Sequence, residues 1–371
     1  MTQSLAIDNI DKTSPCLRLA STISPQLIPM PVSMPISTLR GTWKRLLSDE
    51  RLRRSSQVLS VIKQEVCIFG GEVKPREPID DKIDIFSLTS DGTHLKTKSA
   101  APAPSPRVGS ASAVIDGKMY LFSGRGGADM APIEEQGAVW CFDPANSSWS
   151  KVLPADSSKP FPPPRSYHCS TSDGKNTFFL HAGCPANGRL SDLWKFNINE
   201  RTWTQAPDAP APHRGGTSIA YSGGKLYRMN GFDGSTEQGG SVDVFDIASN
   251  TWSTDTFKAD GNDGPRARSV CVLLSVKLAG KDKLLTLFGE HDPSSLGHAG
   301  AGKMLSDVWI YDINEKWWTQ IHPEGSDGIP EPRGWFDADV IKVENGNDSI
   351  VIHGGLGENN ERLADMWQLA F

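Results

Sequence analysis

One short segment, residues 287–298, gathers two carboxylates and two histidines in the sequence LFGEHDPSSLGH. An apolar run ends at Gly289, Glu290 and Asp292 follow at once, and His298 closes the segment. Carboxylate and imidazole groups are the usual side chains for proton transfer and for binding divalent metal ions. The Asp-Pro dipeptide is also typical of a simple turn. The segment therefore predicts either a functional loop or a polar bend, and its place in the fold has to decide between them.

The composition is that of an ordinary globular protein. The chain has 371 residues, 37% of them hydrophobic and 22% charged, with a formal net charge of -6. A general nucleic-acid binder would carry a basic surplus, and a membrane-spanning helix would need an apolar run of about 20 residues. We therefore expect neither nucleic acid nor membrane as a partner. The 35 glycines, 26 prolines and 11 tryptophans favour many short strands joined by turns.

The six cysteines do not form a disulfide pattern. No pair has CxxC spacing, and several lie inside apolar runs such as Val66–Phe69. Disulfide frameworks belong mainly to short secreted chains. We expect buried free thiols and a cytosolic protein.

Residues 1–40 differ from the rest of the chain. Four prolines at positions 25, 29, 31 and 35 disfavour both helix and central strand, and no continuous apolar core of a signal peptide is present. We predict a flexible leader over residues 1–40 and one folded domain over residues 41–371.

Six repeated units follow the leader. Each begins with an arginine after a polar or proline-rich link, and these repeat arginines are separated by 49 to 65 residues: Arg54, Arg107, Arg165, Arg214, Arg268 and Arg333. Each unit continues with an apolar strand that ends in glycine and a further strand with a central aromatic residue. Most units close with a strand that opens on tryptophan. A period of roughly 50 residues is the length of a kelch repeat. Six such units predict an all-β, six-bladed kelch-type propeller, since a β-sandwich does not explain a sustained period.

The two ends of the repeat region complement each other. The sixth unit ends at Phe371 without its outer tryptophan strand, whereas Gly41–Lys44 offers that strand ahead of the first repeat arginine. We therefore predict that an N-terminal strand containing Trp43 completes the last blade and closes the ring, which leaves no open edge.

Chain direction in a four-stranded blade places the arginine links and the loops after the second strands on one face. The segment at Glu290 then borders a mouth lined by arginines, which would attract an anionic or strongly polar small molecule. The repeat arginines would equally serve to lock neighbouring blades through ion pairs. Tyr167 and Trp335, each two residues after a repeat arginine, would either line a pocket in this mouth or fill the channel.

These features resemble the kelch-type specifier proteins of plants (nitrile-, epithio- and thiocyanate-forming) and their fungal relatives. The resemblance spans about residues 41–371. It rests on the following segments: Phe69-Gly70-Gly71-Glu72, Gly124-Arg125, Pro164-Arg165-Ser166-Tyr167-His168, Arg214-Gly215-Gly216, Glu290 with His298, and Arg333-Gly334-Trp335. It implies iron(II)-dependent redirection of unstable glucosinolate aglucones, which carry a sulfate group. The family's substrate-binding arginine and pocket tryptophan match Arg125 and Trp335.

The iron motif of that family is matched only in part. Glu290 and His298 occupy two of its ligand positions, but Ser294 stands where the family has aspartate, and a neutral hydroxyl is a poor ligand for a divalent cation. Asp292 or His291 would have to substitute. We expect weak iron(II) binding at most and no other cofactor.

Two classes of function follow. The first is an enzyme of lyase or isomerase type, or an acid-catalysed cyclase, that acts on a small molecule in secondary metabolism. Its catalytic residues would be Glu290, Asp292 and Arg125, its metal ligands Glu290, His298 and Asp292, and its substrate-binding residues Arg125, Trp335, Arg333, Tyr167, Arg165 and Glu72. The second is a non-catalytic kelch scaffold that binds a protein partner, because propellers host both.

Overall fold

The computed structural model describes residues 39–89, 95–297 and 300–371. The predicted leader lies outside the described residues except for positions 39 and 40, and His298 also lies outside them. Within the described ranges the chain is built from β-strands, with one short 3-10 helix at Glu50–Leu52. None of the helices described is long and apolar enough to cross a membrane.

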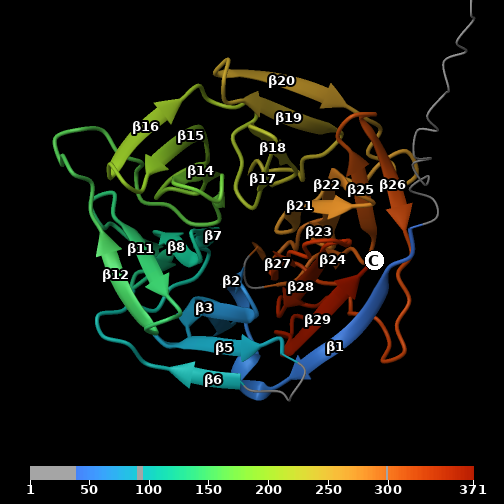
Figure 1. Cartoon of the computed structure of the whole chain (residues 1–371), viewed down its shortest axis with the longest axis horizontal. Coiled ribbons are helices and arrows are strands. Elements are labelled where there is room, and N and C mark those ends of the chain that lie inside the picture. The colour runs from blue at the N-terminus through green and yellow to red at the C-terminus, as the bar shows by residue number, and fades with distance from the viewer. Residues whose placement is uncertain (1–38, 90–94, 298–299) are drawn as a thin grey trace, which may run out of the picture. The chain divides into compact units, whose positions relative to one another are not determined.

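Six antiparallel sheets succeed one another around a central axis, and the colour runs once around the ring from blue to red (Figure 1). The first three blades, each from the axis outward, are β2 (Ser55–Ile62), β3 (Glu65–Lys74), β5 (Ile83–Ser87), β6 (Leu95–Lys98); β7 (Ala111–Ile115), β8 (Lys118–Phe122), β11 (Val139–Asp143), β12 (Ser148–Val152); and β13 (Cys169–Ser172), β14 (Thr177–Gly183), β15 (Leu190–Asn197), β16 (Thr202–Ala206). The last three are β17 (Ser218–Ser222), β18 (Lys225–Met229), β19 (Ser241–Asp246), β20 (Thr251–Thr256); β21 (Val272–Leu278), β22 (Lys281–Leu287), β25 (Val308–Asp312), β26 (Trp317–Ile321); and β27 (Asp337–Ile341), β28 (Ser349–His353), β29 (Asp365–Ala370), β1 (Thr42–Ser48). The predicted six-bladed propeller is confirmed.

In three blades the loop that follows the second strand contains short two-residue strands. They are β4 (Glu77–Pro78), which pairs with β3, the pair β9 (Arg125–Gly126) and β10 (Ala131–Pro132), and the pair β23 (Glu290–His291) and β24 (Lys303–Met304). These strands give fixed backbone positions to Arg125 and Glu290.

The N-terminal strand β1 closes the ring as predicted. It pairs antiparallel with β29, with Trp43 opposite Leu369 and Lys44 opposite Gln368. The blue β1 accordingly lies against the red β29 at the rim of the last blade (Figure 1). Trp43 is buried among side chains of blades five and six, and its ring stacks on Phe288 at 6.0 Å between centroids.

Apolar side chains fill the spaces between adjacent blades. One cluster joins blades five and six, another joins blades one and two, and a third joins blades two and three. The five described cysteines are free, and all but the half-buried Cys184 are buried. The expectation of free thiols is therefore confirmed for these five.

Candidate functional site at the mouth of the propeller

A ring of six backbone hydrogen bonds surrounds the axis at one face. The residue two positions after each repeat arginine has positive φ, between 47° and 62°, and donates its backbone N–H to the equivalent residue of a neighbouring blade at 2.7–3.0 Å. The six ring residues are Ser56, Gly109, Tyr167, Gly216, Val270 and Trp335. Only two of them are glycine, and left-handed backbone costs a bulky residue roughly 1–2 kcal/mol. This ring holds Tyr167 and Trp335 at the mouth in a fixed orientation.

The repeat arginines lie beneath this ring and are buried, with at most 3% of any of them exposed. Arg165 donates to the carbonyls of Pro163 and Ala182 and pairs with both carboxylate oxygens of Asp192 at 2.6 and 2.8 Å. Arg333 repeats this pattern with Asp365. Each of these two buried guanidinium groups donates four hydrogen bonds inside the fold, which favours a framework role. Their assignment as substrate-binding residues stays a prediction. The repeat arginines are buried and do not line the mouth. Their ion pairs join segments of a single blade rather than neighbouring blades.

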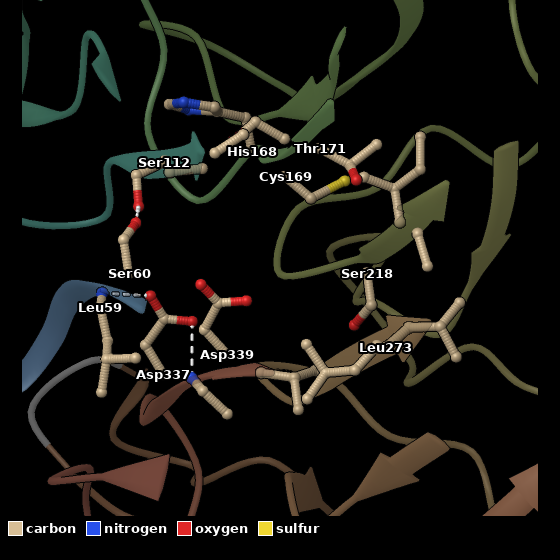
Figure 2. A pocket seen from close by; sticks show the side chains of 18 of the residues that line it. Leu59, Ser60, Ser112, His168, Cys169, Thr171, Ser218, Leu273, Asp337 and Asp339 are labelled. Carbon is tan, nitrogen blue, oxygen red and sulfur yellow. Dashed lines mark hydrogen bonds between the residues drawn. The ribbon is translucent and has the colours of Figure 1, made fainter. Parts of the chain in front are cut away.

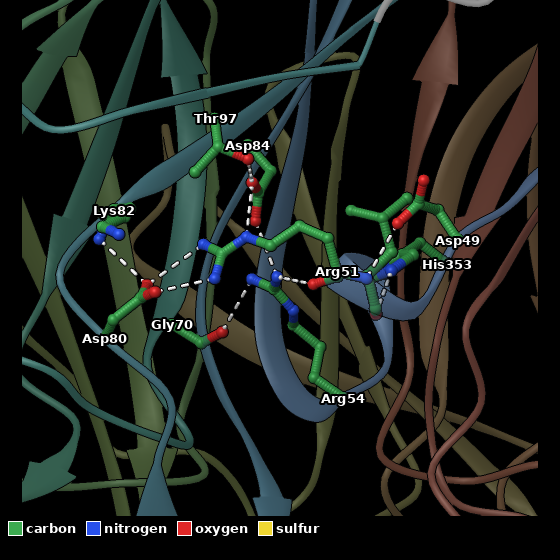
Figure 3. Close-up of polar contacts among 10 residues, drawn as sticks. Asp49, Arg51, Arg54, Gly70, Asp80, Lys82, Asp84, Thr97 and His353 are labelled. Carbon is green, nitrogen blue, oxygen red and sulfur yellow. Dashed lines mark hydrogen bonds and ion pairs between the residues drawn. The ribbon is translucent and has the colours of Figure 1, made fainter.

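Blade one shows how such an ion pair is arranged within a single blade (Figure 3). The buried Arg54 donates to Asp84 at 2.6 Å and to the carbonyl of Gly70. Arg51 reaches the same Asp84 and also pairs with Asp80 at 2.7 Å. Two guanidinium groups thus share two carboxylates, so the charges in this cluster, in which Arg54 and Asp84 are buried and Arg51 and Asp80 half-buried, balance.

Backbone bridges bring the arginine links and the loops after the second strands together, as predicted. Ser269, next to Arg268, exchanges two backbone hydrogen bonds with Glu290, and Val108 exchanges two with Arg125. Glu290 and Arg125 therefore border the same face as Tyr167 and Trp335.

Glu290 is the buried carboxylate of the loop. It is 4% exposed, and its Oε1 accepts a hydrogen bond from the backbone N–H of Gly302 at 2.8 Å. A Cβ atom at Gly302 would lie 2.6 Å from this oxygen, so glycine is required for the approach. Burial raises the pKa of Glu290 to about 7. A carboxyl group in this state can donate or accept a proton near neutral pH.

A second carboxyl group, Glu237, lies near Glu290 and was not predicted. The hydroxyl of Ser269 donates to its Oε1 at 3.2 Å, and its Oε2 is buried without a hydrogen-bond partner. Burial and then the nearby carboxylates of Glu290, Asp233 and Asp292 raise its pKa to about 8. It lies in the loop after the second strand of blade four, which is the counterpart of the loop that holds Glu290, and this is the sequence signal that would have found it.

The other predicted residues of this face differ in their freedom. Asp292 is exposed and has positive φ. Glu72 is buried and held by Arg362 at 3.0 Å and by the backbone N–H of Arg76. Arg125 is half-buried beside Glu72 and Tyr167 in a small recess, and its Nε has no hydrogen-bond partner. Among the residues that the structure describes, no carboxylate forms an ion pair with Arg125.

A channel of about 580 Å³ runs beneath the mouth along the inner strands. Tyr167 and Trp335 line it, so they contribute to a cavity wall rather than fill the channel completely. Two carboxyl groups that were not predicted, Asp337 and Asp339, lie next to each other on the wall formed by β27 (Figure 2). They accept hydrogen bonds from the backbone N–H groups of Leu59 and Val61 of the neighbouring blade, and burial raises their pKa values to about 7 and about 6.

The described residues do not fit an iron site. No three His, Cys, Asp or Glu side chains come together as metal ligands in the described part of the chain. The hydroxyl of Ser294 accepts the backbone N–H of Leu296 at 3.2 Å, and Asp292 is exposed. His298 lies outside the described residues, so its predicted role as a ligand stays a prediction.

We expect calorimetry under anaerobic conditions to detect only weak, exchangeable iron(II) binding by the unmodified protein. Ser294→Asp should tighten binding by about 10-fold or more, because it adds an anionic oxygen ligand beside Glu290. Glu290→Ala should abolish binding in both backgrounds. Tight binding by the unmodified protein that survives Glu290→Ala would contradict this assignment of the ligands.

Comparison with known proteins places this architecture in a family. The family model described as the KLHDC2/KLHL20/DRC7 kelch-repeats domain matches residues 56–289 and 157–345. The chain therefore belongs to the kelch-repeat family.

The resemblance to specifier proteins is also confirmed. The chain is 28% identical over 364 residues to the N-(sulfonatooxy)prop-2-enimidothioate sulfolyase of Thlaspi arvense, a match that covers 90% of this chain and 98% of the relative. It is 28% identical to the F-box/kelch-repeat protein At1g51550 of Arabidopsis thaliana, of which it covers 54%. The solved structure of YjhT has the same fold, with a TM-score of 0.65 at 15% identity over 85% of this chain and 94% of that one.

Proposed function

We propose that this protein is a lyase-type enzyme that acts on an anionic, sulfate-bearing small molecule at the mouth of the propeller. The observation that carries the proposal concerns Arg125, which lies at the mouth and was predicted to bind an anion. Unlike the other arginines predicted to bind substrate, it has no carboxylate partner among the described residues. The match to a sulfolyase along 98% of that relative's length supports the same class of substrate.

The residues of the mouth have different roles in the proposed reaction, according to their side-chain chemistry. In the elimination of an N-linked sulfate, the N–O bond breaks and sulfate leaves with the bonding electron pair. Negative charge then accumulates on the sulfate oxygens, where a guanidinium such as that of Arg125 stabilises it. Trp335 and Tyr167 offer apolar ring surface to the organic part of the substrate.

Proton transfer to the leaving group falls to the carboxyl groups. Burial raises the pKa of Glu290 to about 7, so Glu290 is partly protonated at neutral pH and can give its proton to a sulfate oxygen as the N–O bond breaks, so that hydrogen sulfate leaves and the Glu290 carboxylate remains. Asp292 lies at the exposed edge of the same loop and serves as the second carboxylate. Glu72 is held by Arg362 and borders the recess that contains Arg125, where we assign it the role of positioning the substrate.

We expect Arg125→Ala to reduce product formation by roughly 10- to 100-fold, the equivalent of a lost charged hydrogen bond of about 1.5–3 kcal/mol. The test supplies freshly generated N-(sulfonatooxy)prop-2-enimidothioate and compares the products, with and without protein, by mass spectrometry. An unaltered product distribution with the unmodified protein would overturn the proposed reaction on this compound. Full activity of Arg125→Ala would remove Arg125 from the anion-binding role.

A further inference from the structure

Blade four differs from the other five in the partner of its repeat arginine. In those five blades an acid forms an ion pair with the arginine: Asp84, Glu135, Asp192, Asp307 or Asp365. Arg214 of blade four, 3% exposed, donates to the carbonyls of Pro212 and Asn230. Among the described residues no carboxylate lies within ion-pair distance of its guanidinium.

The strand register explains the difference. Asp192, Asp307 and Asp365 each stand two residues before the tryptophan of their third strand, and that tryptophan accompanies the ion pair by donating to the same carboxylate. In blade four the strand register places Asp243 at the position of that tryptophan. The position of the aspartate, two residues earlier, is therefore occupied by Ser241. Blade four therefore has a half-buried hydroxyl where three other blades have a carboxylate.

Asp243 does not replace the missing partner. Its Oδ2 pairs with Arg228, and its Oδ1 accepts a hydrogen bond from Thr254 at 2.7 Å. Arg214 and Arg228 both donate to the carbonyl of Pro212, so the two guanidinium groups are close neighbours. Asp243 thus pairs with Arg228 alone and Arg214 has no ion-pair partner among the described residues, whereas in blade one two arginines pair with two aspartates. A buried charge without a counter-ion is costly.

The orientation of Arg214 matches that of the paired arginines. Arg214 donates its Nε–H to the carbonyl of Pro212 and an Nη1–H to that of Asn230. Arg333 makes the same two contacts with the equivalent carbonyls, those of Glu331 and Gly354. In Arg333 the remaining N–H groups of Nη1 and Nη2 grip both oxygens of Asp365. Those groups of Arg214 accordingly face the position of Ser241. The side chains of Asp307 and Asp365 are 16% and 18% exposed, so solvent reaches the equivalent position in blades five and six, and Ser241 is itself half-buried.

We propose that blade four binds a small inorganic oxyanion, of the sulfate or phosphate type, between Arg214 and Ser241, where it takes the place of the carboxylate found in the other blades. Two parallel N–H groups of a guanidinium match two oxygens of such an anion, and the Ser241 hydroxyl is a further donor. Burial, and then the neighbouring charge of Arg228, lower the pKa of Arg214 to about 10, and the more distant carboxylates of Asp243 and Asp233 offset this only in part. The anion stabilises the fold and is independent of the function proposed for the mouth.

The test follows the melting temperature at low ionic strength as sodium sulfate or sodium phosphate is added, with sodium chloride at matched ionic strength as reference. The unmodified protein should gain about 2–4 °C in a saturable manner with each oxyanion. Arg125→Ala should show the same gain, because it removes only the anion site proposed at the mouth. Ser241→Asp should start at a higher melting temperature and lose the saturable gain, since its carboxylate occupies the site.

Ser241→Asn is the matched control, because it has nearly the same size as aspartate but no charge. It should be less stable than Ser241→Asp in the absence of oxyanions. A sulfate response in Ser241→Asp equal to that of the unmodified protein would overturn the proposal. So would a lower stability of Ser241→Asp than of Ser241→Asn, or a gain that chloride reproduces in full. Loss of the gain in Arg125→Ala would reassign the oxyanion to the mouth and equally overturn it.

Discussion

Replacing Trp43 with alanine is expected to lower the free energy of unfolding by about 3–5 kcal/mol, the usual cost of removing a buried tryptophan side chain. Trp43 is 3% exposed, stacks on Phe288, and packs with the apolar side chains that join blades five and six. Its backbone N–H also donates to the carbonyl of Glu324 at 2.6 Å. The side chain therefore fastens the first strand of the propeller to its last two blades. Urea denaturation followed by circular dichroism measures the change.

Two truncations separate this closure from any contribution of the leader. Removal of residues 1–40 should leave the melting temperature nearly unchanged, whereas removal of residues 1–48 takes away β1 and exposes the edge of β29. The second truncation should lower the melting temperature sharply. If both truncated proteins melt alike, the closing strand does not stabilise the ring.

Replacing Arg333 with alanine is expected to cost about 3–5 kcal/mol, because it leaves the Asp365 carboxylate without the cation that neutralises it inside the fold. Arg333 is fully buried and holds both Asp365 oxygens as well as the carbonyl of Gly354. It thereby ties the link into β27 to the ends of β28 and β29. Denaturant unfolding of the purified variant gives the value.

Arg125→Ala is the matched control for this substitution. It removes the same side chain from the same face, but Arg125 is half-buried and forms no ion pair among the described residues. Its loss should change the free energy of unfolding by less than about 1 kcal/mol. Equal destabilisation by the two substitutions would mean that Arg125 also locks the fold and is unsuited to binding substrate.

The six-bladed fold and its closure could be predicted because both depend on short-range patterns in the sequence. Each blade repeats the same short-range signals, a strand ending in glycine and an outer strand opening on tryptophan. The missing strand of blade six and the spare strand at Trp43 are therefore visible without knowledge of the contacts. The face that holds Glu290 and Arg125 follows from chain direction alone, since consecutive antiparallel strands return to the same side.

The roles of the arginines could not be predicted, because sequence shows a cation but not its counter-ion. The sequence pattern presents Arg165, Arg214 and Arg333 as equivalent. The tertiary structure pairs Arg165 and Arg333 with aspartates, whereas in blade four Asp243 pairs with Arg228 and not with Arg214. Arg165 and Arg333, which were predicted to bind substrate, are thus buried and ion-paired within the fold.

The carboxyl groups show the same division. The sequence by itself identified Glu290, because this residue stands in a loop crowded with polar side chains, and it identified the loop's place at the mouth. Only the tertiary structure decided that Glu290 is buried with a raised pKa, that Glu237 lies nearby, and that Asp337 meets Leu59 across 278 residues of chain. The physical reason is that a carboxyl group's protonation depends on the solvent it loses and the charges it meets. Both are set by side chains from other blades.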